Sequence, residues 1–529
     1  MLAKLVDRAV ARRLKLTPAT TGYRVNRDVA VPMRDGVTLL ADHYAPSDAT
    51  GTLLMRGPYG RAAPAARIMA GLYARRGYHV VLLSSRGTFG SEGVFDPGRD
   101  EVRDGADVVA WLRGQDWFTG TFATVGGSYL GYTQWALLVD PPPELETAVI
   151  TMGPHDFGRA VWGTGSFALG DFLSWAYLVA WQQHGGWVRQ LVRSTRAPRR
   201  LRPVLSGLPP TEVARALLGS GSRWYESWLA HPDPDDGYWR PLRLSEAFAR
   251  VQQPVLLTGG WQDVFIDQTL DQFRALRAHG ADVSLLIGPW THGEGGGGMA
   301  IRESLSWLAG ERTSSVRIFV TGGGGWRELT DWPPTGTETT LHPGPAASLT
   351  DEPAPSDTPQ ARFVFNPLDP TPTIGGRLLT ASAAGFRDDS VLALRGDVLD
   401  FTGRVLDADL EVIGNPYVEL AHGTDTEWAD VSVRISDVDA NGKSRNVTDG
   451  YVRLGPGRDR RLRIDFDPMA HRFRAGHRIR LLVAGGSFPR FARNLGTGES
   501  FASGRRLVTT THVVGYGVET RLVLPTGRG

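Results

Sequence analysis

The chain has 529 residues, of which 41% are hydrophobic and 22% are charged, a composition typical of packed globular domains and not of disordered protein. At about 100–200 residues per domain, this length predicts about three domains. The formal net charge of +2 argues against a dedicated surface for nucleic acid or anionic membrane. The absence of cysteine excludes a disulfide framework, a thiolate nucleophile and a cysteine-ligated metal site.

The first stretch of the chain, MLAKLVDRAVARRLKL, interrupts its apolar residues with charges. This pattern predicts a short amphipathic helix and does not fit the apolar core of a signal peptide. No run of about 18 apolar residues occurs anywhere, so no membrane span is expected. We expect a cytoplasmic protein with neither nucleic-acid nor membrane partners.

Residues 23–46 have the pattern of a β-hairpin. Two strand-like runs flank a turn at Asp35-Gly36, where glycine supplies the positive φ that a tight turn needs. Over residues 50–150, buried-strand runs such as GTLLM and YHVVLLSS alternate with helical patterns. This alternation is typical of an α/β unit with a mainly parallel sheet.

The character of the sequence then changes twice. Residues 146–245 lose their strand signals and predict a helical cap, inserted into an α/β-hydrolase domain that comprises residues 1–145 and 246–345. Residues 341–359 are rich in Pro, Ser, Thr and Asp, which predicts a linker. Short alternating runs follow at regular spacing, so residues 346–529 are expected to form an all-β jelly-roll sandwich.

The sharpest chemical signal lies in VGGSYLGYTQW. A strand-like run enters a Gly-Gly-Ser turn, and a helical pattern begins directly after it. Such a corner exposes the serine hydroxyl at the top of a sheet and aims helix N-terminal amides at the group that the serine attacks. The second glycine of the usual G-x-S-x-G pattern comes one position late, at Gly131. Ser128 is therefore a candidate nucleophile, and the alternative is a glycine-rich turn whose serine only caps the helix.

A nucleophilic serine needs a base, and the base needs an orienting carboxylate. In an α/β-hydrolase sheet these follow in the order Ser, Asp/Glu, His, each after a strand. Asp263 follows the run PVLLTGG, and His292 follows VSLLIGPW. Three residues at three strand ends in this order predict a catalytic triad with Ser128. Asp267 is a weaker alternative acid because it falls at the start of the next helix, and His155 follows the serine too early.

An oxyanion that develops during acyl transfer needs hydrogen-bond donors. The amide of Tyr129 follows the candidate nucleophile and is one such donor. The loop RGPYGR follows an earlier strand and offers the hydroxyl of Tyr59 as a second. Taken alone, these residues equally allow Tyr59 to be a partly buried loop aromatic.

These stretches resemble the cocaine-esterase-like and X-Pro dipeptidyl-peptidase-like serine hydrolases (S15-type, CocE/NonD), a family that includes α-amino-acid ester hydrolases. The likeness is carried by RGPYGR, by VGGSYLGYTQW with its late glycine, by TGGWQDVF and by IGPWTHG. In the C-terminal region it is carried by GHRIRLLVAGGSFPRFARNLGTG. It covers nearly the whole chain, from about Tyr23 onward.

The resemblance implies an α/β-hydrolase domain, an inserted helical cap and a C-terminal jelly roll that helps to wall the active site. It implies Ser128 as nucleophile with Asp263 and His292 as its partners, and Tyr59 with the Tyr129 amide as the oxyanion hole. Dimers are common in the family, so a homodimer is a candidate assembly. The glycine-rich segment after the triad histidine departs from the family, which leaves the conformation of that loop open.

By alignment with the family, Trp162, Trp175 and Phe265 fall around the acyl pocket. The alternative for the two tryptophans is the core of the cap, the usual fate of tryptophan in a helical segment. Aromatic walls make a flat apolar slot, which favours an aryl or medium-length acyl group.

We therefore expect a serine esterase that acts on a small-molecule ester or amide through an acyl-enzyme. The alternatives are an X-Pro dipeptidyl peptidase, an α-amino-acid ester hydrolase or acylase and, from another class, a catalytically inactive binding protein. A dipeptidyl peptidase needs a carboxylate for the substrate's α-ammonium group. Between Met152 and Ser206 the cap offers only Asp156 and Asp171, so this requirement is poorly met unless the aspartates of residues 233–236 fold inward. No metal-site spacing occurs, so neither metal nor cofactor is expected.

Overall fold

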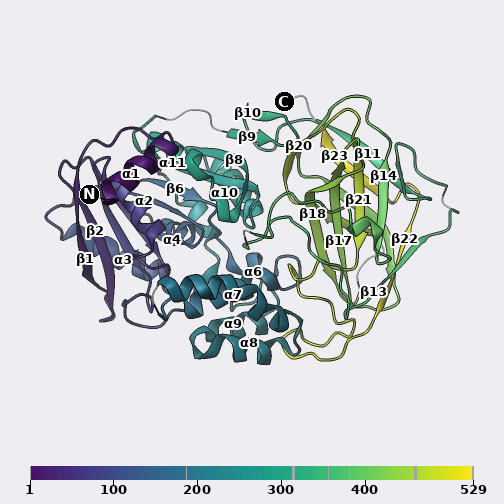
Figure 1. Ribbon diagram of the computed structural model, residues 1–529, viewed down its shortest axis with the longest axis horizontal. Helices are drawn as coiled ribbons and strands as arrows, with labels where there is room; N and C mark the ends of the chain where they lie inside the picture. The colour runs from purple at the N-terminus through teal and green to yellow at the C-terminus, as the bar shows by residue number, and fades with distance from the viewer. Residues whose placement is uncertain are drawn as a thin grey trace.

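The computed structural model describes residues 2–185, 187–311, 316–355, 357–380, 382–457 and 461–526. Figure 1 shows an N-terminal α/β part beside a C-terminal β part, with helices α6 to α9 packed along their lower junction. This arrangement confirms the predicted fold class, an α/β-hydrolase domain with a helical insert followed by an all-β domain.

The first sheet has the strand order β1-β2-β4-β3-β5-β6-β7-β8-β9-β10. From β4 to β9 in this order the neighbouring strands are parallel, whereas β1, β2 and β10 join antiparallel. The predicted hairpin is confirmed, because β1 and β2 pair with Tyr23 opposite Pro46. The strands of this sheet are β1 (Tyr23–Pro32), β2 (Thr38–Pro46), β3 (Gly51–Gly57), β4 (Tyr78–Ser84), β5 (Phe122–Gly127), β6 (Leu145–Thr151), β7 (Val255–Gln262), β8 (Val283–Thr291), β9 (Val316–Val320) and β10 (Gly325–Leu329).

Both faces of this sheet are buried, which explains why its strands are continuous apolar runs. Successive side chains of a strand point to opposite faces, so Leu54 packs in the core under α4 while Leu53 packs in the core under α2. The helices of this part are α1 (Leu2–Arg13), α2 (Pro64–Ala74), α3 (Glu101–Arg113), α4 (Tyr129–Leu138), α10 (Ile266–Ala278) and α11 (Gly297–Leu308).

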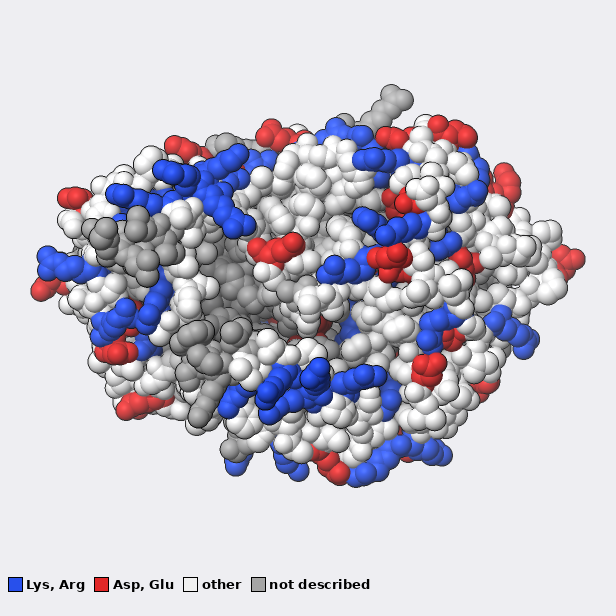
Figure 2. Space-filling model, viewed as in Figure 1, with Lys and Arg blue, Asp and Glu red and all other residues white. Residues whose placement is uncertain are grey.

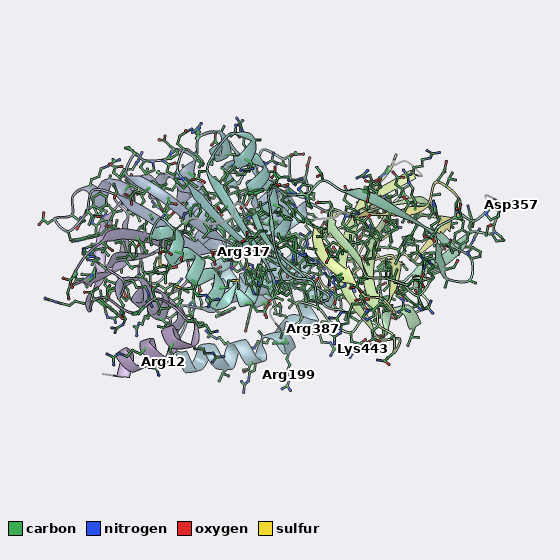
Figure 3. The ribbon with its side chains drawn as sticks, turned by 90° about the horizontal axis from the view of Figure 1, so that it is seen from above. Arg12, Arg199, Arg317, Asp357, Arg387 and Lys443 are labelled. Atoms are coloured by element: carbon green, nitrogen blue, oxygen red, sulfur yellow. The ribbon has the colours of Figure 1, made fainter. Side chains whose placement is uncertain are left out.

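The insert is held together by aromatic rings, with Trp162, Trp228 and Trp239 fully buried. The outward face of α7 is basic and carries arginine without any acidic residue. These arginines belong to the blue row below the centre of Figure 2, and Arg199 points away from the protein in Figure 3. The elements of the insert are α5 (Phe157–Trp162), α6 (Leu169–Trp181), α7 (Trp187–Ser206), α8 (Pro210–Leu218), η1 (Gly219–Ser222), α9 (Arg223–Ala230), η2 (Arg240–Leu242) and η3 (Ser245–Ala249).

The C-terminal part is a sandwich whose strands follow the order β13-β22-β16-β23-β11-β12-β14-β21-β17-β18, with β19 on β16 and β15 paired to β20. Nearly all of its pairs are antiparallel. Its elements are β11 (Thr337–Gly344), β12 (Ser348–Thr350), β13 (Ala361–Phe365), η5 (Leu392–Leu394), β14 (Val398–Gly403), β15 (Leu410–Gly414), β16 (Tyr417–Thr424), β17 (Ala429–Val438), β18 (Ser444–Leu454), β19 (Arg461–Asp465), β20 (Met469–Phe473), β21 (Arg478–Ala484), β22 (Thr510–Gly515) and β23 (Arg521–Thr526).

The linker predicted over residues 341–359 is wrong in its first part. The end of β11 and all of β12 lie there, and Leu341 and Leu349 are buried in the sandwich core. The many Pro, Ser and Thr residues around these two leucines conceal the strand pattern in the sequence. Within the described residues, no helix combines the length and the apolar character needed to cross a membrane.

Candidate active site

Four of the predicted site residues directly follow strands at one edge of the first sheet. Strands β3, β5, β7 and β8 run in the same direction, so the segments that follow them emerge together. Tyr59 follows β3, Ser128 follows β5, Asp263 follows β7 and His292 follows β8. The sheet therefore gathers side chains that are far apart in the sequence.

Ser128 occupies a strained corner between β5 and α4, with φ 58° and ψ −125°. A non-glycine residue rarely takes a positive φ, and such strain is concentrated at functional sites. The corner needs small neighbours. A Cβ on Gly126 would lie 2.5 Å from Cβ of Leu130, and one on Gly131 would lie 2.6 Å from Cα of Gly153. The late glycine thus lets α4 cross closely over the backbone at Gly153.

Two short contacts join the serine, the histidine and the aspartate. Nε2 of His292 lies 2.9 Å from Oγ of Ser128, and Nδ1 of His292 lies 2.6 Å from Oδ1 of Asp263. The carboxylate accepts a hydrogen bond from the N–H at Nδ1, which leaves Nε2 as the acceptor for the serine hydroxyl. The three side chains therefore form one continuous hydrogen-bonded chain.

Asp263 is fully buried, and its charge is supported on both oxygens. The second oxygen, Oδ2, accepts a hydrogen bond from the amide of Phe265 at 3.2 Å. Burial raises the pKa of Asp263, and the nearby His292 opposes that rise. The alternative acid, Asp267, points elsewhere, because its Oδ1 lies 3.1 Å from Nη1 of Arg377.

The loop after β8, whose conformation the sequence left open, is a compact turn. His292 begins the 3-10 turn η4 (His292–Glu294), and Oε2 of Glu294 accepts hydrogen bonds from the amide and hydroxyl of Thr291 at 2.7 and 3.0 Å. This capping box fixes the backbone on both sides of the histidine. The glycines that follow lead directly into α11.

The hydroxyl of Tyr59 lies beside Ser128. It accepts a hydrogen bond from Nε1 of Trp175 at 3.1 Å, and Tyr59 lines the same cavity as Ser128. Burial raises the pKa of Tyr59, so the phenol keeps its proton as a donor. The amide of Tyr129 is the first of α4 and therefore has no acceptor within its helix. The Tyr129 hydroxyl faces the other way and accepts from the amide of Gly98 at 2.9 Å.

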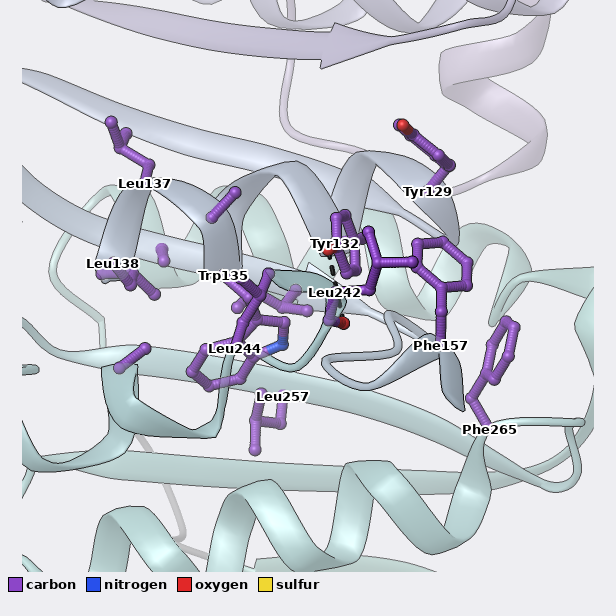
Figure 4. Close-up of a cluster of buried hydrophobic side chains, with 14 of the residues drawn as sticks. Tyr129, Tyr132, Trp135, Leu137, Leu138, Phe157, Leu242, Leu244, Leu257 and Phe265 are labelled. Atoms are coloured by element: carbon purple, nitrogen blue, oxygen red, sulfur yellow. Dashed lines mark hydrogen bonds between the residues drawn. The ribbon is translucent and has the colours of Figure 1, made fainter. Parts of the chain in front are cut away.

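An apolar cavity opens on Ser128. Phe157 and Phe265, labelled at the right of the buried cluster in Figure 4, both line this cavity. Trp175 and Phe265 line it as predicted, whereas sequence reasoning did not find Leu379. Phe172 lies three residues before Trp175 on α6, so helical spacing alone places the two side chains on the same face of the helix. The cavity is lined by Tyr59, Ser128, Tyr129, Pro154, Phe157, Phe172, Trp175, Phe265 and Leu379.

The pocket position predicted for Trp162 is not found. Its indole N–H donates to the backbone oxygen of Trp228 at 2.8 Å, and its ring lies 5.0 Å from that of Phe167. Trp162 is thus part of the cap core, the alternative weighed above, because α5 turns this side chain away from Ser128. His155 is also structural, since burial lowers its pKa to about 3.

The acidic loop at residues 233–236 stays outside. Asp235 is 80% exposed and pairs with Arg243 at 2.9 Å. Of the two cap carboxylates considered, Asp156 caps α5 and pairs with the same arginine at 2.8 Å, and Asp171 is buried and accepts a hydrogen bond from the amide of Leu379. Among the described residues, no group of three or more His, Asp or Glu side chains is arranged to hold a metal ion.

The fold and the site together define the class of protein. A parallel sheet with a helical insert and a serine at a strained strand–helix corner is the architecture of an α/β hydrolase. Two family descriptions match the chain: "X-Pro dipeptidyl-peptidase (S15 family)" over residues 35–294, and "X-Pro dipeptidyl-peptidase C-terminal non-catalytic domain" over residues 309–520. The chain belongs to this S15 and CocE/NonD family of serine hydrolases, as the motifs predicted.

Individual relatives agree with this assignment. Cocaine esterase of Rhodococcus sp. (strain MB1 Bresler) is 31% identical, over 90% of this chain and 93% of its own. The crystal structure of an aminopeptidase from a marine sediment archaeon (Thaumarchaeota archaeon) superposes with a TM-score of 0.82 at 22% identity, covering 97% of this chain and 98% of that one. The structure of an α-amino acid ester hydrolase superposes with a TM-score of 0.81 at 21% identity, covering 96% of this chain and 98% of that one. These two structures share the fold.

The strain at Ser128 predicts an unusual order of stability. Glycine adopts a positive φ without a steric penalty, so Ser128→Gly should be more stable than Ser128→Ala by about 1 kcal/mol, despite the greater freedom of glycine in the unfolded chain. Urea unfolding of the two variants measures this difference.

Ser306, which lies in α11, provides the matched control. There the order should reverse, with Ser306→Gly less stable than Ser306→Ala by about 1 kcal/mol. The same order at both positions would contradict a strained corner at Ser128.

Proposed function

We propose that this protein hydrolyses small uncharged carboxylic esters through an acyl-enzyme on Ser128. The observation that carries the proposal is the hydrogen-bonded chain from Ser128 through His292 to Asp263, which ends at an apolar cavity. A serine whose proton can move to a buried, oriented imidazole is an activated nucleophile.

The proposed reaction has two halves. Oγ of Ser128 attacks the ester carbonyl carbon while its proton moves to Nε2 of His292. The tetrahedral intermediate then expels the alkoxide, which takes that proton and leaves as the alcohol. Water next gives a proton to the same nitrogen and attacks the acyl-enzyme, and the collapse of the second intermediate returns the proton to Ser128 and releases the carboxylic acid. Asp263 stabilises the imidazolium that forms in each half.

Tyr59 and the Tyr129 amide are the proposed oxyanion donors. The Tyr59 hydroxyl already accepts from Trp175, so its own proton is available for an oxygen beside Ser128. Its raised pKa favours the protonated form. Both donors are held by the fold before substrate arrives, which is what makes such groups effective in a transition state.

The cavity supports an uncharged acyl group. None of its lining residues is charged, and Phe157, Phe172, Trp175 and Phe265 supply aromatic walls. A dipeptidyl peptidase or an amino-acid ester hydrolase would need a free carboxylate for an ammonium group. The acidic loop at residues 233–236 does not line the cavity. The name of the relative cocaine esterase agrees with the ester assignment.

The first prediction concerns the nucleophile and its partners. Ser128→Ala should abolish both ester hydrolysis and covalent labelling by a fluorophosphonate. Asp263→Asn should lower kcat about 10⁴-fold, because the histidine loses the acceptor that selects its tautomer. Activity assays and mass spectrometry of the labelled peptide measure both effects.

Ser306→Ala, a hydroxyl deletion on α11, should label and turn over like the wild type. The double variant Ser128→Ala/His292→Ala should be little worse than Ser128→Ala, because the members of a triad act as a unit. Labelling of Ser128→Ala at another serine would exclude this assignment of the nucleophile.

Tyr59→Phe removes the hydroxyl that is the proposed oxyanion donor and that also accepts the indole N–H of Trp175. We expect kcat to fall about 10²–10³-fold, with KM nearly unchanged, since the lost hydrogen bond forms mainly in the transition state. Steady-state kinetics with p-nitrophenyl butyrate measures kcat and KM separately. An unchanged kcat would assign the second donor to a backbone amide instead.

The substrate class is tested on the wild type. p-Nitrophenyl butyrate and phenyl benzoate should be turned over with a higher kcat/KM than Gly-Pro-anilide, because the lining has no free charge for the dipeptide ammonium group. A higher kcat/KM for the anilide would replace the esterase proposal with the peptidase alternative.

A further inference from the structure

One segment of the C-terminal domain reaches into the active site. Residues 375–379, here called the strap, follow β13 in the chain. They begin beside β18 of the β sandwich and end at the cavity beside Ser128. The strap begins on two glycines with φ +62° and +88°. A Cβ on Gly375 would lie 2.8 Å from Oδ1 of Asn446, and one on Gly376 would lie 2.6 Å from Oδ2 of Asp449. The strap therefore starts in close contact with β18.

Arg377 ties the middle of the strap to both domains. Its Nη1 donates to Oδ1 of Asp267 at 3.1 Å, and its Nε lies 2.5 Å from Oδ2 of Asp467. Asp267 is in the first turn of α10, the helix that follows the Asp263 loop. A planar guanidinium can hold two carboxylates at fixed angles, which suits a link between rigid elements.

Asp171 holds the end of the strap from the cap side. Its Oδ1 accepts a hydrogen bond from the amide of Leu379 at 2.8 Å, and the aspartate is 2% exposed. It lies in the first turn of α6, the helix that supplies Phe172 and Trp175 to the cavity. A buried carboxylate is costly unless its partners are well placed, which favours keeping this hydrogen bond. The bond joins α6, which lines the cavity from the cap, to Leu379, which lines it from the C-terminal domain.

Gly385, which pairs with the strap, lies beside the residue that precedes His292. Gly376 and Gly385 exchange two backbone hydrogen bonds of 2.9 Å, and a Cβ on Gly385 would lie 3.1 Å from Cγ2 of Thr291, the residue before His292. Figure 3 places Arg387, two residues beyond Gly385, where the two large domains meet. The strap is thus held on several sides, and Leu379 is the side chain that it presents to the cavity.

We propose that Asp171 is a positioning residue that sets the length of acyl chain the site accepts, by holding Leu379 as the wall of the cavity. The inference rests on the proposed esterase function. In this arrangement the C-terminal domain determines specificity through one leucine, and the hydrogen bond to Asp171 keeps that leucine in place. Loss of the bond lets the wall withdraw without disturbing Ser128 or His292.

The test compares Asp171→Ala, Asp171→Asn and Leu379→Ala on p-nitrophenyl acetate, butyrate and octanoate. Asp171→Ala and Leu379→Ala should each raise the octanoate-to-acetate ratio of kcat/KM about tenfold, since a few methylenes in an apolar pocket discriminate on this scale. Asp171→Asn keeps an oxygen that can accept the amide, so its ratio should stay near that of the wild type.

Ser174→Ala is the matched control on the same helix. It deletes a hydrogen bond to the backbone oxygen of Gly170 but does not line the cavity, so the ratio should not change. An unchanged ratio in both Asp171→Ala and Leu379→Ala would overturn the proposal. A raised octanoate-to-acetate ratio in Asp171→Asn, equal to that of Asp171→Ala, would also overturn it, because the hydrogen-bond acceptor would then not be what holds Leu379 in place.

Hydrogen exchange supplies a readout that does not need turnover. The amide of Leu379 should exchange at least tenfold faster in Asp171→Ala than in the wild type, and at the wild-type rate in Ser174→Ala. Unchanged exchange in Asp171→Ala overturns the anchor. If Asp171→Ala fails to fold, Leu379→Ala still tests whether Leu379 limits the acyl chain. Asp171→Asn then tests whether a hydrogen-bond acceptor at residue 171 is enough to hold Leu379.

A separate probe distinguishes failure of the esterase proposal. If the wild type hydrolyses none of the esters, the proposed function fails, and the strap is judged by the rates at which ethyl and octyl fluorophosphonates label Ser128. A rise in the octyl-to-ethyl ratio in Leu379→Ala and Asp171→Ala supports the strap, and an unchanged ratio overturns it.

Discussion

The proposed active site depends on a hydrogen-bonded chain whose members lie 164 and 29 residues apart, at contact distances of 2.9 and 2.6 Å. Such a chain forms only if β5, β7 and β8 end at one edge of the sheet in a fixed register. A slip of one residue would move a loop by about 3.3 Å and reverse the direction of its side chain. Helices cover both faces of the sheet, so the side chains of each strand pack into two hydrophobic cores, and this packing fixes the register.

Elements outside the parallel sheet complete the site. Trp175 of the cap is both a wall of the cavity and the donor that orients the hydroxyl of Tyr59. The C-terminal domain also supports the proposed triad, since Nε2 of Gln262, the residue before Asp263, donates to the backbone oxygen of Val447 at 3.0 Å. With Leu379 at the cavity, three regions of the chain converge on one serine. A sandwich that seems peripheral in sequence is therefore part of the site.

Much of this could be read from the residues alone. The alternation of strands and helices predicted the α/β fold, and the fading of strand signals predicted the helical insert. The insert begins later than residue 146, because β6 (Leu145–Thr151) is a strand of the sheet, paired with β5 and β7. The order of Ser128, Asp263 and His292 at strand ends predicted a triad, and in the structure His292 lies 2.9 Å from Ser128 and 2.6 Å from Asp263. Local composition misled at residues 341–359, where strand pairing with β23 and β14 overrides a turn-like sequence.

The sequence by itself determined the order of the elements and the chemistry at each strand end, since both are local properties that periodicity and turn residues encode. Only the tertiary structure decided which side chains share the cavity. Trp162 and Trp175 have the same residue type in neighbouring helices, yet one is buried in the cap core and the other reaches Ser128, because α5 and α6 present different faces to the sheet. Leu379 and Asp171 meet only when the two domains pack together, and no pattern within either segment records that contact.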